Sequence, residues 1–124
     1  MKTTNLNLSV AEAVAHVRNS LSEKGFTIFA EIDHQANAQG VELELAEART
    51  LIFGNPLAGT KLMQKDITMA LDLPIRLALV SNGGQTQLLH QTAADYSSQY
   101  AVEGHPVLEK IEELFAALEA ELSN

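Results

Sequence analysis

The chain has 124 residues, the size of one ordinary domain, and 46% of them are hydrophobic. Its formal net charge is −8, and the eight basic residues are scattered along the sequence. Nucleic acids and anionic membranes attract Lys and Arg, so this charge argues against both as partners. The absence of cysteine excludes disulfides and thiolate chemistry. No apolar run is long enough to cross a bilayer, and we expect one soluble, cytoplasmic domain over residues 1–124.

The N-terminal part of the chain predicts a strand followed by a helix. Residues 3–8 have the pattern of a short edge strand. Ser9 and Glu12 have the spacing of a capping box, in which each side chain accepts a hydrogen bond from the other residue's backbone amide. Apolar residues then recur at helical spacing up to a glycine, which predicts a helix over residues 10–24.

The next segments predict a strand and a helical turn. Residues 26–33 are expected to form a strand, and regular alternation would place Glu31, Asp33 and Phe29 on the same face. The other face would consist of Phe26, Ile28, Ala30 and Ile32. A short helical turn is expected over 34–40. The pattern of the five residues that follow fits both strand and helix.

The middle of the chain predicts a strand that leads into a helix. The apolar, β-prone residues 49–54 indicate the strand. Asn55 and Pro56 are typical of the N-cap and the first position of a helix, which we expect over 57–64. Another turn is expected over 66–73, before a proline.

The C-terminal part predicts a β-hairpin and two helices. Strands are expected over 75–80 and 85–90, joined by an Asn-Gly turn. Helices follow over 93–100 and 105–122. The last helix has an apolar stripe at helical spacing, which consists of Leu108, Ile111, Phe115, Leu118 and Leu122. Together these elements predict a single α+β domain, with a mostly antiparallel sheet and helices packed on one face.

Residues 54–61, Gly-Asn-Pro-Leu-Ala-Gly-Thr-Lys, nearly match a phosphate-binding P-loop. In a P-loop the lysine comes before the hydroxyl residue, but here Thr60 precedes Lys61, so we reject nucleotide hydrolysis. A helix N-terminus after a glycine turn still offers free amides and partial positive charge. Gly54, Asn55, Thr60 and Lys61 are therefore candidates for holding a small anion. In the alternative interpretation, Asn55 only caps the helix and Gly54 only lets the backbone turn.

Three blocks of sequence carry a family resemblance. Residues 25–38 run from Gly-Phe into Ile-Asp-His, residues 51–63 contain Phe-Gly-Asn-Pro and Gly-Thr, and residues 70–80 contain Leu-Asp-Leu-Pro before a strand. In this order the blocks resemble the domain-of-unknown-function family 302. The resemblance implies a small α+β fold with a β-α-β-β-β-β-α order, and it implies no reaction, substrate or cofactor. After residue 90 the chain departs from the family pattern with a long acidic helix.

Glu31, Asp33 and His34 form the densest group of titratable residues. A carboxylate beside an imidazole can orient a general base, so an enzyme could use His34 as the base and Asp33 to orient it. In another interpretation, Arg49 and Arg76 on neighbouring strands form ion pairs with Glu31 across the sheet, either as a structural contact or as the lining of a polar pocket, in which Arg49 and Arg76 are candidates for binding the ligand.

These features leave three hypotheses of function. The first is a module that binds a small anionic or polar molecule between the 31–34 turn and the 54–61 loop. The second is an enzyme that uses the same pocket, and the third is an interaction protein that acts through helix 105–122. The apolar stripe of that helix fits either the core or a twin helix in a homodimer. The four histidines lack metal-binding spacing, so no metal site and no cofactor are expected.

Overall fold

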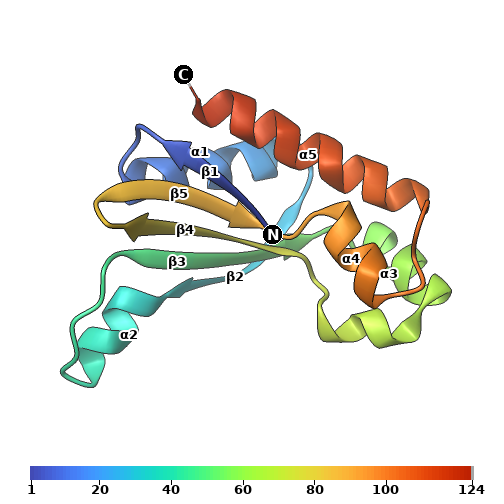
Figure 1. Ribbon diagram of the computed structural model, residues 1–124, viewed down its shortest axis with the longest axis horizontal. Coiled ribbons are helices and arrows are strands. Elements are labelled where there is room, and N and C mark those ends of the chain that lie inside the picture. Colours follow the sequence, from blue (N-terminus) through green and yellow to red (C-terminus); the bar gives the residue numbers. More distant parts are fainter. Residues whose placement is uncertain (124) are drawn as a thin grey trace.

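The computed structural model describes residues 1–123 and shows a five-stranded antiparallel sheet with the strand order β1-β5-β4-β3-β2 (Figure 1). The strands are β1 (Lys2–Leu6), β2 (Thr27–Asp33), β3 (Ala48–Gly54), β4 (Arg76–Asn82) and β5 (Gln85–His90). The helices are α1 (Val10–Glu23), α2 (His34–Gly40), α3 (Pro56–Lys65), the 3-10 helix η1 (Ile67–Leu71), α4 (Ala93–Gln99) and α5 (Pro106–Leu122). The predicted α+β class is confirmed.

Helices α1 and α3 begin at residues whose side chains accept hydrogen bonds from the free backbone amides of the first turn. The hydroxyl of Ser9 accepts from the amide of Glu12 at 3.1 Å, and the Glu12 carboxylate accepts from the amide of Ser9 at 3.0 Å, so the predicted capping box is present. The side chain of Asn55 accepts from the amide of the second residue of α3 at 2.9 Å, and Pro56 is the first residue of that helix. Residues 41–47, which follow α2, form neither helix nor strand.

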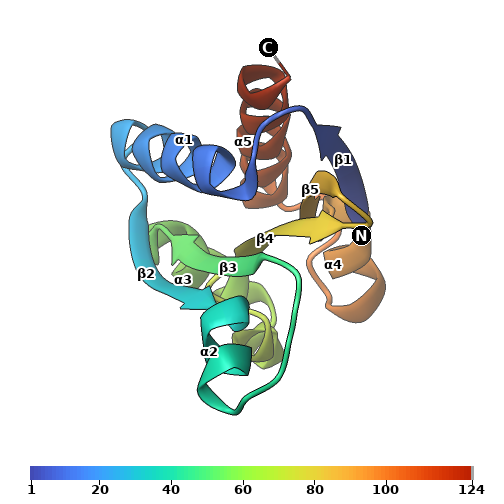
Figure 2. The same ribbon diagram turned by 90° about the vertical axis from the view of Figure 1, so that its left-hand side faces the viewer.

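The hydrophobic core lies between the sheet and the two longest helices. Both α1 and α5 lie on the same side of the sheet (Figure 2). All five residues of the predicted apolar stripe of α5 are buried. The ring of Phe115 contacts Phe53 edge-on with centroids 6.2 Å apart, and it stacks on His90 at 3.8 Å. The stripe therefore packs into the core of this domain, and not against a twin helix.

Glu121 of α5 forms hydrogen bonds and ion pairs with residues of α1 and its C-cap. The carboxylate of Glu121 accepts from Lys24 Nζ at 2.8 Å and from Ser20 Oγ at 2.7 Å, and it lies 3.1 Å from His16 Nε2. The hydrogen bonds from Lys24, Ser20 and His16 outweigh partial burial and lower the pKa of Glu121 to about 2. Part of the acidic surface of α5 is thus used within the domain.

A β-bulge in β2 changes which side chains face the core. The register of β2 against β3 shifts between Ile28 and Ala30, which leaves Phe29 without a partner. An extra residue in one strand turns the following side chains to the opposite faces of the sheet. Ile28 therefore shares the core side with Glu31, while Ala30 and Ile32 face outward. The prediction that Ile28, Ala30 and Ile32 share one face is wrong for this reason.

Candidate functional site

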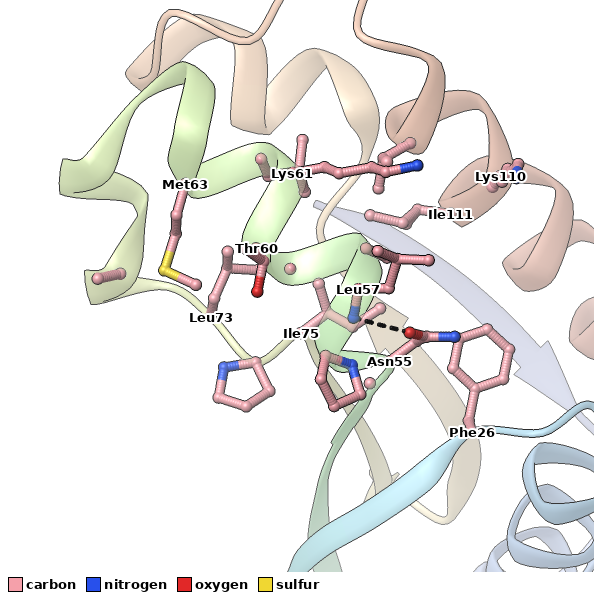
Figure 3. Close-up of a pocket in the computed structure, with 18 of the residues that line it drawn as sticks. Phe26, Asn55, Leu57, Thr60, Lys61, Met63, Leu73, Ile75, Lys110 and Ile111 are labelled. Atoms are coloured by element: carbon pink, nitrogen blue, oxygen red, sulfur yellow. Dashed lines mark hydrogen bonds between the residues drawn. The ribbon is translucent and has the colours of Figure 1, made fainter.

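A cavity of about 500 Å³ lies at the end of the sheet where β2 begins and β3 ends (Figure 3). Its walls come from the start of β2, from α3, from the segment between η1 and β4, and from α5. Most of the lining is apolar and includes Phe26, Leu57, Met63, Leu73, Ile75 and Ile111. A cavity of this size and character is typical of sites for small molecules.

Four of the predicted binding residues line this cavity, namely Gly54, Asn55, Thr60 and Lys61. They come together because β3 delivers Gly54 to the cavity and α3 then turns along its wall. The carbonyl oxygen of the Asn55 side chain is occupied as the cap of α3. Its amide nitrogen has no hydrogen-bond partner within residues 1–123. The capping interpretation of Asn55 is confirmed, and its role toward an anion stays a prediction.

Two lysines provide the positive charge at the cavity. Lys61 of α3 extends towards α5, the helix that carries Lys110 (Figure 3). Neither ammonium group forms an ion pair with a residue in the described part of the chain, whereas Lys2, Lys24, Arg18 and Arg49 all do. Lys110 was missed from the sequence because it lies on the last helix, 49 positions after Lys61, and no motif connects the two.

Gly59 lies inside α3 and lines the cavity, although nothing in the fold requires a glycine there. Its backbone has an ordinary helical conformation, and a Cβ atom built on it would meet no heavy atom within 4 Å. Glycine inside a helix costs up to about 1 kcal/mol relative to alanine. The missing side chain leaves space in the cavity beside the backbone of α3.

We expect Gly59→Ala to raise the free energy of unfolding by about 0.5–1 kcal/mol, since alanine favours the helix and meets no steric obstacle. Urea unfolding followed by circular dichroism measures this change. Gly84→Ala is the matched control and should destabilise the domain, because Gly84 has a φ of +84°, which alanine adopts only with strain. A loss of stability in Gly59→Ala would contradict the expectation.

The predicted cluster of Glu31, Asp33 and His34 lies at the other end of the sheet. Antiparallel pairing places Thr27 beside Gly54 and Asp33 beside Arg49. Six residues of extended strand separate Thr27 from Asp33, which is about 20 Å. The 31–34 turn therefore contributes nothing to the cavity that the 54–61 loop lines. The prediction of one pocket between these two segments is wrong.

The carboxylates of β2 form an ion-pair network with arginines. Glu31 accepts from Arg18 at 2.8 Å and from Arg49 at 3.1 Å, and Arg49 also lies 3.6 Å from Asp33. The predicted cross-strand pair between Glu31 and Arg49 is confirmed. Arg76 does not take part, because its register opposite Ile52 places it on the outer face of the sheet. The network has the structural role that the sequence left as an alternative.

Asp33 and His34 do not form the predicted acid–base pair in this structure. Asp33 caps α2 by accepting from the amide of Ala36 at 3.0 Å. The ring of His34 instead lies 2.8 Å from the hydroxyl of Thr50 on β3. Each side chain is occupied locally, and neither orients the other. Within residues 1–123, no three His, Asp or Glu side chains are placed to hold a metal ion.

Two contacts between distant residues were missed from the sequence. The hydroxyl of Tyr100 donates to Asp72, and this hydrogen bond raises the pKa of Tyr100. The buried ring of His90 lies with Nε2 at 2.9 Å from Glu119 and Nδ1 at 2.9 Å from the carbonyl of Gln91. Both contacts join segments more than 25 residues apart, so no local motif indicates them.

The sequence profile of a known family, Domain of unknown function DUF302, matches residues 2–122. The chain belongs to this family. Because the match continues through α5, the acidic last helix is part of the DUF302 domain, and the expected departure from the family pattern after residue 90 is corrected.

A solved structure shows the same DUF302 fold. The crystal structure of an uncharacterized conserved DUF302 protein from Bacillus stearothermophilus superposes with a TM-score of 0.81. The similarity covers 98% of this chain and 96% of that protein, at 16% sequence identity. At this level of identity the likeness establishes the fold.

Among curated proteins, the DUF302 chain is similar to fluoride-specific ion channels of Brucella. It is 41% identical over 75 residues to "Fluoride-specific ion channel FluC 1" of Brucella suis and to the protein of the same name from Brucella abortus. The matched region is 60% of this chain but only 30% and 28% of those proteins, respectively. No helix in residues 1–123 is long and apolar enough to span a membrane.

Proposed function

We propose that this DUF302 domain binds a small amphipathic molecule that combines an apolar body with one anionic group, such as a carboxylate. The observation that carries the proposal is an apolar cavity of about 500 Å³ lined by two lysines that lack ion-pair partners within the described residues. The cavity lies within the size range of small-molecule sites, and such sites usually combine apolar walls with few polar groups.

The two lysines favour an anionic ligand because they place positive charge at the cavity of a chain whose net charge is negative. The protein carries 16 acidic and eight basic residues, so its formal net charge is −8. Two ammonium groups without ion-pair partners in the described residues lie beside an apolar surface and can attract a negative group there.

The apolar walls define the rest of the ligand. Leu57 is 64% exposed and Phe29 is 50% exposed, yet both line the cavity. Covering these side chains would remove apolar surface from water, which stabilises a complex by about 25 cal/mol per Å². A purely polar anion would gain nothing from this surface, so we narrow the ligand predicted from the sequence to one with an apolar body.

Decanoate and decanol are suitable probes, since they share an apolar chain and differ in the charge of the head group. We expect decanoate to bind more tightly than decanol when measured by isothermal titration calorimetry. The double variant Lys61→Ala/Lys110→Ala should lose at least about tenfold in decanoate affinity, equivalent to about 1.4 kcal/mol, and little in decanol affinity. Equal binding of the two probes to the native protein would contradict an anion-selective site.

Two further variants locate the site. Lys65→Ala removes a lysine of α3 that does not line the cavity, so it should leave decanoate affinity unchanged. Gly59→Leu places a side chain in the open space beside α3 and should weaken both probes. If Gly59→Leu folds normally and binds decanoate as the native protein does, the ligand does not occupy this cavity.

The similarity to the Brucella proteins favours a second candidate function. We propose that the domain assists a fluoride channel, since a similar segment makes up less than a third of proteins named as such channels. This candidate can be tested by measuring the growth, in medium that contains fluoride, of a bacterial strain that lacks its own fluoride channel. Co-expression of this chain with a channel should raise resistance above that of the channel alone. Equal growth in both cases would refute the candidate.

A further inference from the structure

The two faces of the sheet differ in burial. On the core face, the side chains of Leu51, Leu77, Leu79 and Leu88 are at most 1% exposed. The alternate side chains along the same strands point away from α1 and α5, and all of them are partly or fully exposed. We define the open face as this outer surface of the sheet. Its apolar side chains are Ala30, Ile32, Ile52, Ala78, Val80 and Leu89, and its polar ones include Thr3, Asn5, Thr50, Gln87 and Arg76.

The open face carries six apolar side chains among its polar ones, which is a large apolar share for a sheet surface in water. In antiparallel sheets with one solvated face, the residues on that face are ordinarily polar. Here polar residues of the open face bond to one another, because Gln87 donates to Asn5 at 3.0 Å and accepts from Asn82 at 3.2 Å. These two hydrogen bonds satisfy part of the polar capacity of the three side chains within the sheet.

Charge is also distributed unevenly between this surface and the rest of the chain. None of the 16 acidic residues faces outward from the described strands, since the bulge in β2 turns Glu31 and Asp33 to the core side. The charged side chain on the outer face of these strands is that of Arg76, at the start of β4. Two copies of a protein with a net charge of −8 repel one another, and this surface is where they can approach without opposing carboxylates.

We propose that two copies of this chain pack open face to open face as a two-fold symmetric dimer. A sheet surface that carries no carboxylate and presents small and branched side chains can pack against a second copy of itself, as a two-fold interface requires. Sheets that pack in this way lie about 10 Å apart with their strands about 30° from parallel. Ala78, between Thr50 of β3 and Leu89 of β5, lies near the centre of this interface.

In projection, the sheet supplies about half of the area that each partner of a standard interface buries. Five strands about 4.8 Å apart and about 20 Å long form a face of roughly 400 Å² in projection, while a standard interface removes about 800 Å² of accessible surface from each partner. The arm formed by α2 and residues 41–47 projects at the β2 end of the sheet (Figures 1 and 2). Its Val41, Leu43 and Leu45 are 66%, 64% and 49% exposed, but they alternate with Glu42 and Glu44 and precede Glu47, so the carboxylate-free part of the interface is the sheet itself.

Sedimentation-velocity ultracentrifugation of the full chain tests the proposal. We expect the native protein at 50 μM to sediment with twice its chain mass of 13.4 kDa. Ala78→Lys should sediment as a monomer at the same concentration, because it places a charge at the centre of the interface. A lysine also lowers the net negative charge, so general repulsion between copies does not explain this loss.

Two controls keep the result interpretable. Leu71→Lys makes a similar change at a residue of η1 that is 80% exposed and away from the open face, so it should remain a dimer. Circular dichroism and thermal unfolding should show that Ala78→Lys is folded. A native protein that is monomeric at 50 μM overturns the proposal, and so does a folded Ala78→Lys that remains a dimer. Ala78 does not line the cavity, so neither result depends on ligand binding.

Discussion

A chain that ends after Gly104, and so lacks α5, should not fold. Seven side chains of this helix are buried in the core: Val107, Leu108, Ile111, Leu114, Phe115, Leu118 and Leu122. Burial of one such side chain stabilises a protein by about 1.5–3 kcal/mol, so together they contribute roughly 10–20 kcal/mol before entropic costs. Small domains have a net stability of about 5–15 kcal/mol, which the loss of α5 would remove.

Circular dichroism and proton–nitrogen NMR spectra of the shortened chain measure this outcome. We expect low ellipticity and narrow amide dispersion, as in an unfolded chain. Glu109→Ala and Glu113→Ala in the full-length protein are suitable controls, because both residues are exposed on α5. They should change stability by less than about 0.5 kcal/mol. A shortened chain with a dispersed spectrum would show that α5 is an accessory helix, as the interaction hypothesis from the sequence requires.

Glu119→Ala should cost about 3 kcal/mol of stability, although this residue lies on the same helix as the exposed glutamates. The His90 side chain is 2% exposed and that of Glu119 is 15% exposed. Nε2 of the ring donates to the Glu119 carboxylate at 2.9 Å, and Nδ1 lies 2.9 Å from the carbonyl oxygen of Gln91. Removing the carboxylate leaves that buried donor without an acceptor and also removes the partner of Lys2.

The effect of Glu119→Ala should depend on pH. Burial alone raises the pKa of Glu119, but hydrogen bonds from Lys2 and His90 outweigh it, so the pKa lies below its ordinary value of 4.5. A lowered pKa means that the carboxylate stabilises the fold fully above about pH 4.5 and loses this contribution as pH falls through the lowered value.

Urea unfolding of the native protein and the variant at pH 7, 4 and 3 measures this dependence. The difference in free energy of unfolding should be largest at pH 7 and should shrink at pH 3. Glu113→Ala provides the reference at each pH. A difference that is constant over this range would mean that Glu119 acts by packing alone and not as an ionised partner.

Local sequence patterns were sufficient for the secondary structure of this chain. The capping box of Ser9 and Glu12, the Asn55-Pro56 helix start and the Asn-Gly hairpin each depend on residues a few positions apart. The interactions that begin or end these elements are complete within one turn. The apolar stripe of α5 likewise predicts its buried side from helical spacing alone.

The sequence predicted only one wall of the cavity. The other walls depend on which strand ends and helices lie side by side, and this is decided by the tertiary structure. Residues 54–61 were identified as a candidate loop from their own glycines and helix start, and the structure places them in the cavity wall. Their supposed partners at 31–34 lie at the opposite end of β2, since antiparallel pairing reverses the direction of neighbouring strands. Lys110 joins the cavity only because α5 packs beside α3.

The sequence by itself determined the fold class, the order of the elements and the buried stripe of the last helix, because these follow from short-range periodicity and capping. The tertiary structure alone decided the faces of β2, where one extra residue at Phe29 reverses every later side chain. It also decided the cavity and the pair of His90 and Glu119, which join segments far apart in the chain. Strand pairing and helix packing set these distances, and neither leaves a signal in a local window of residues.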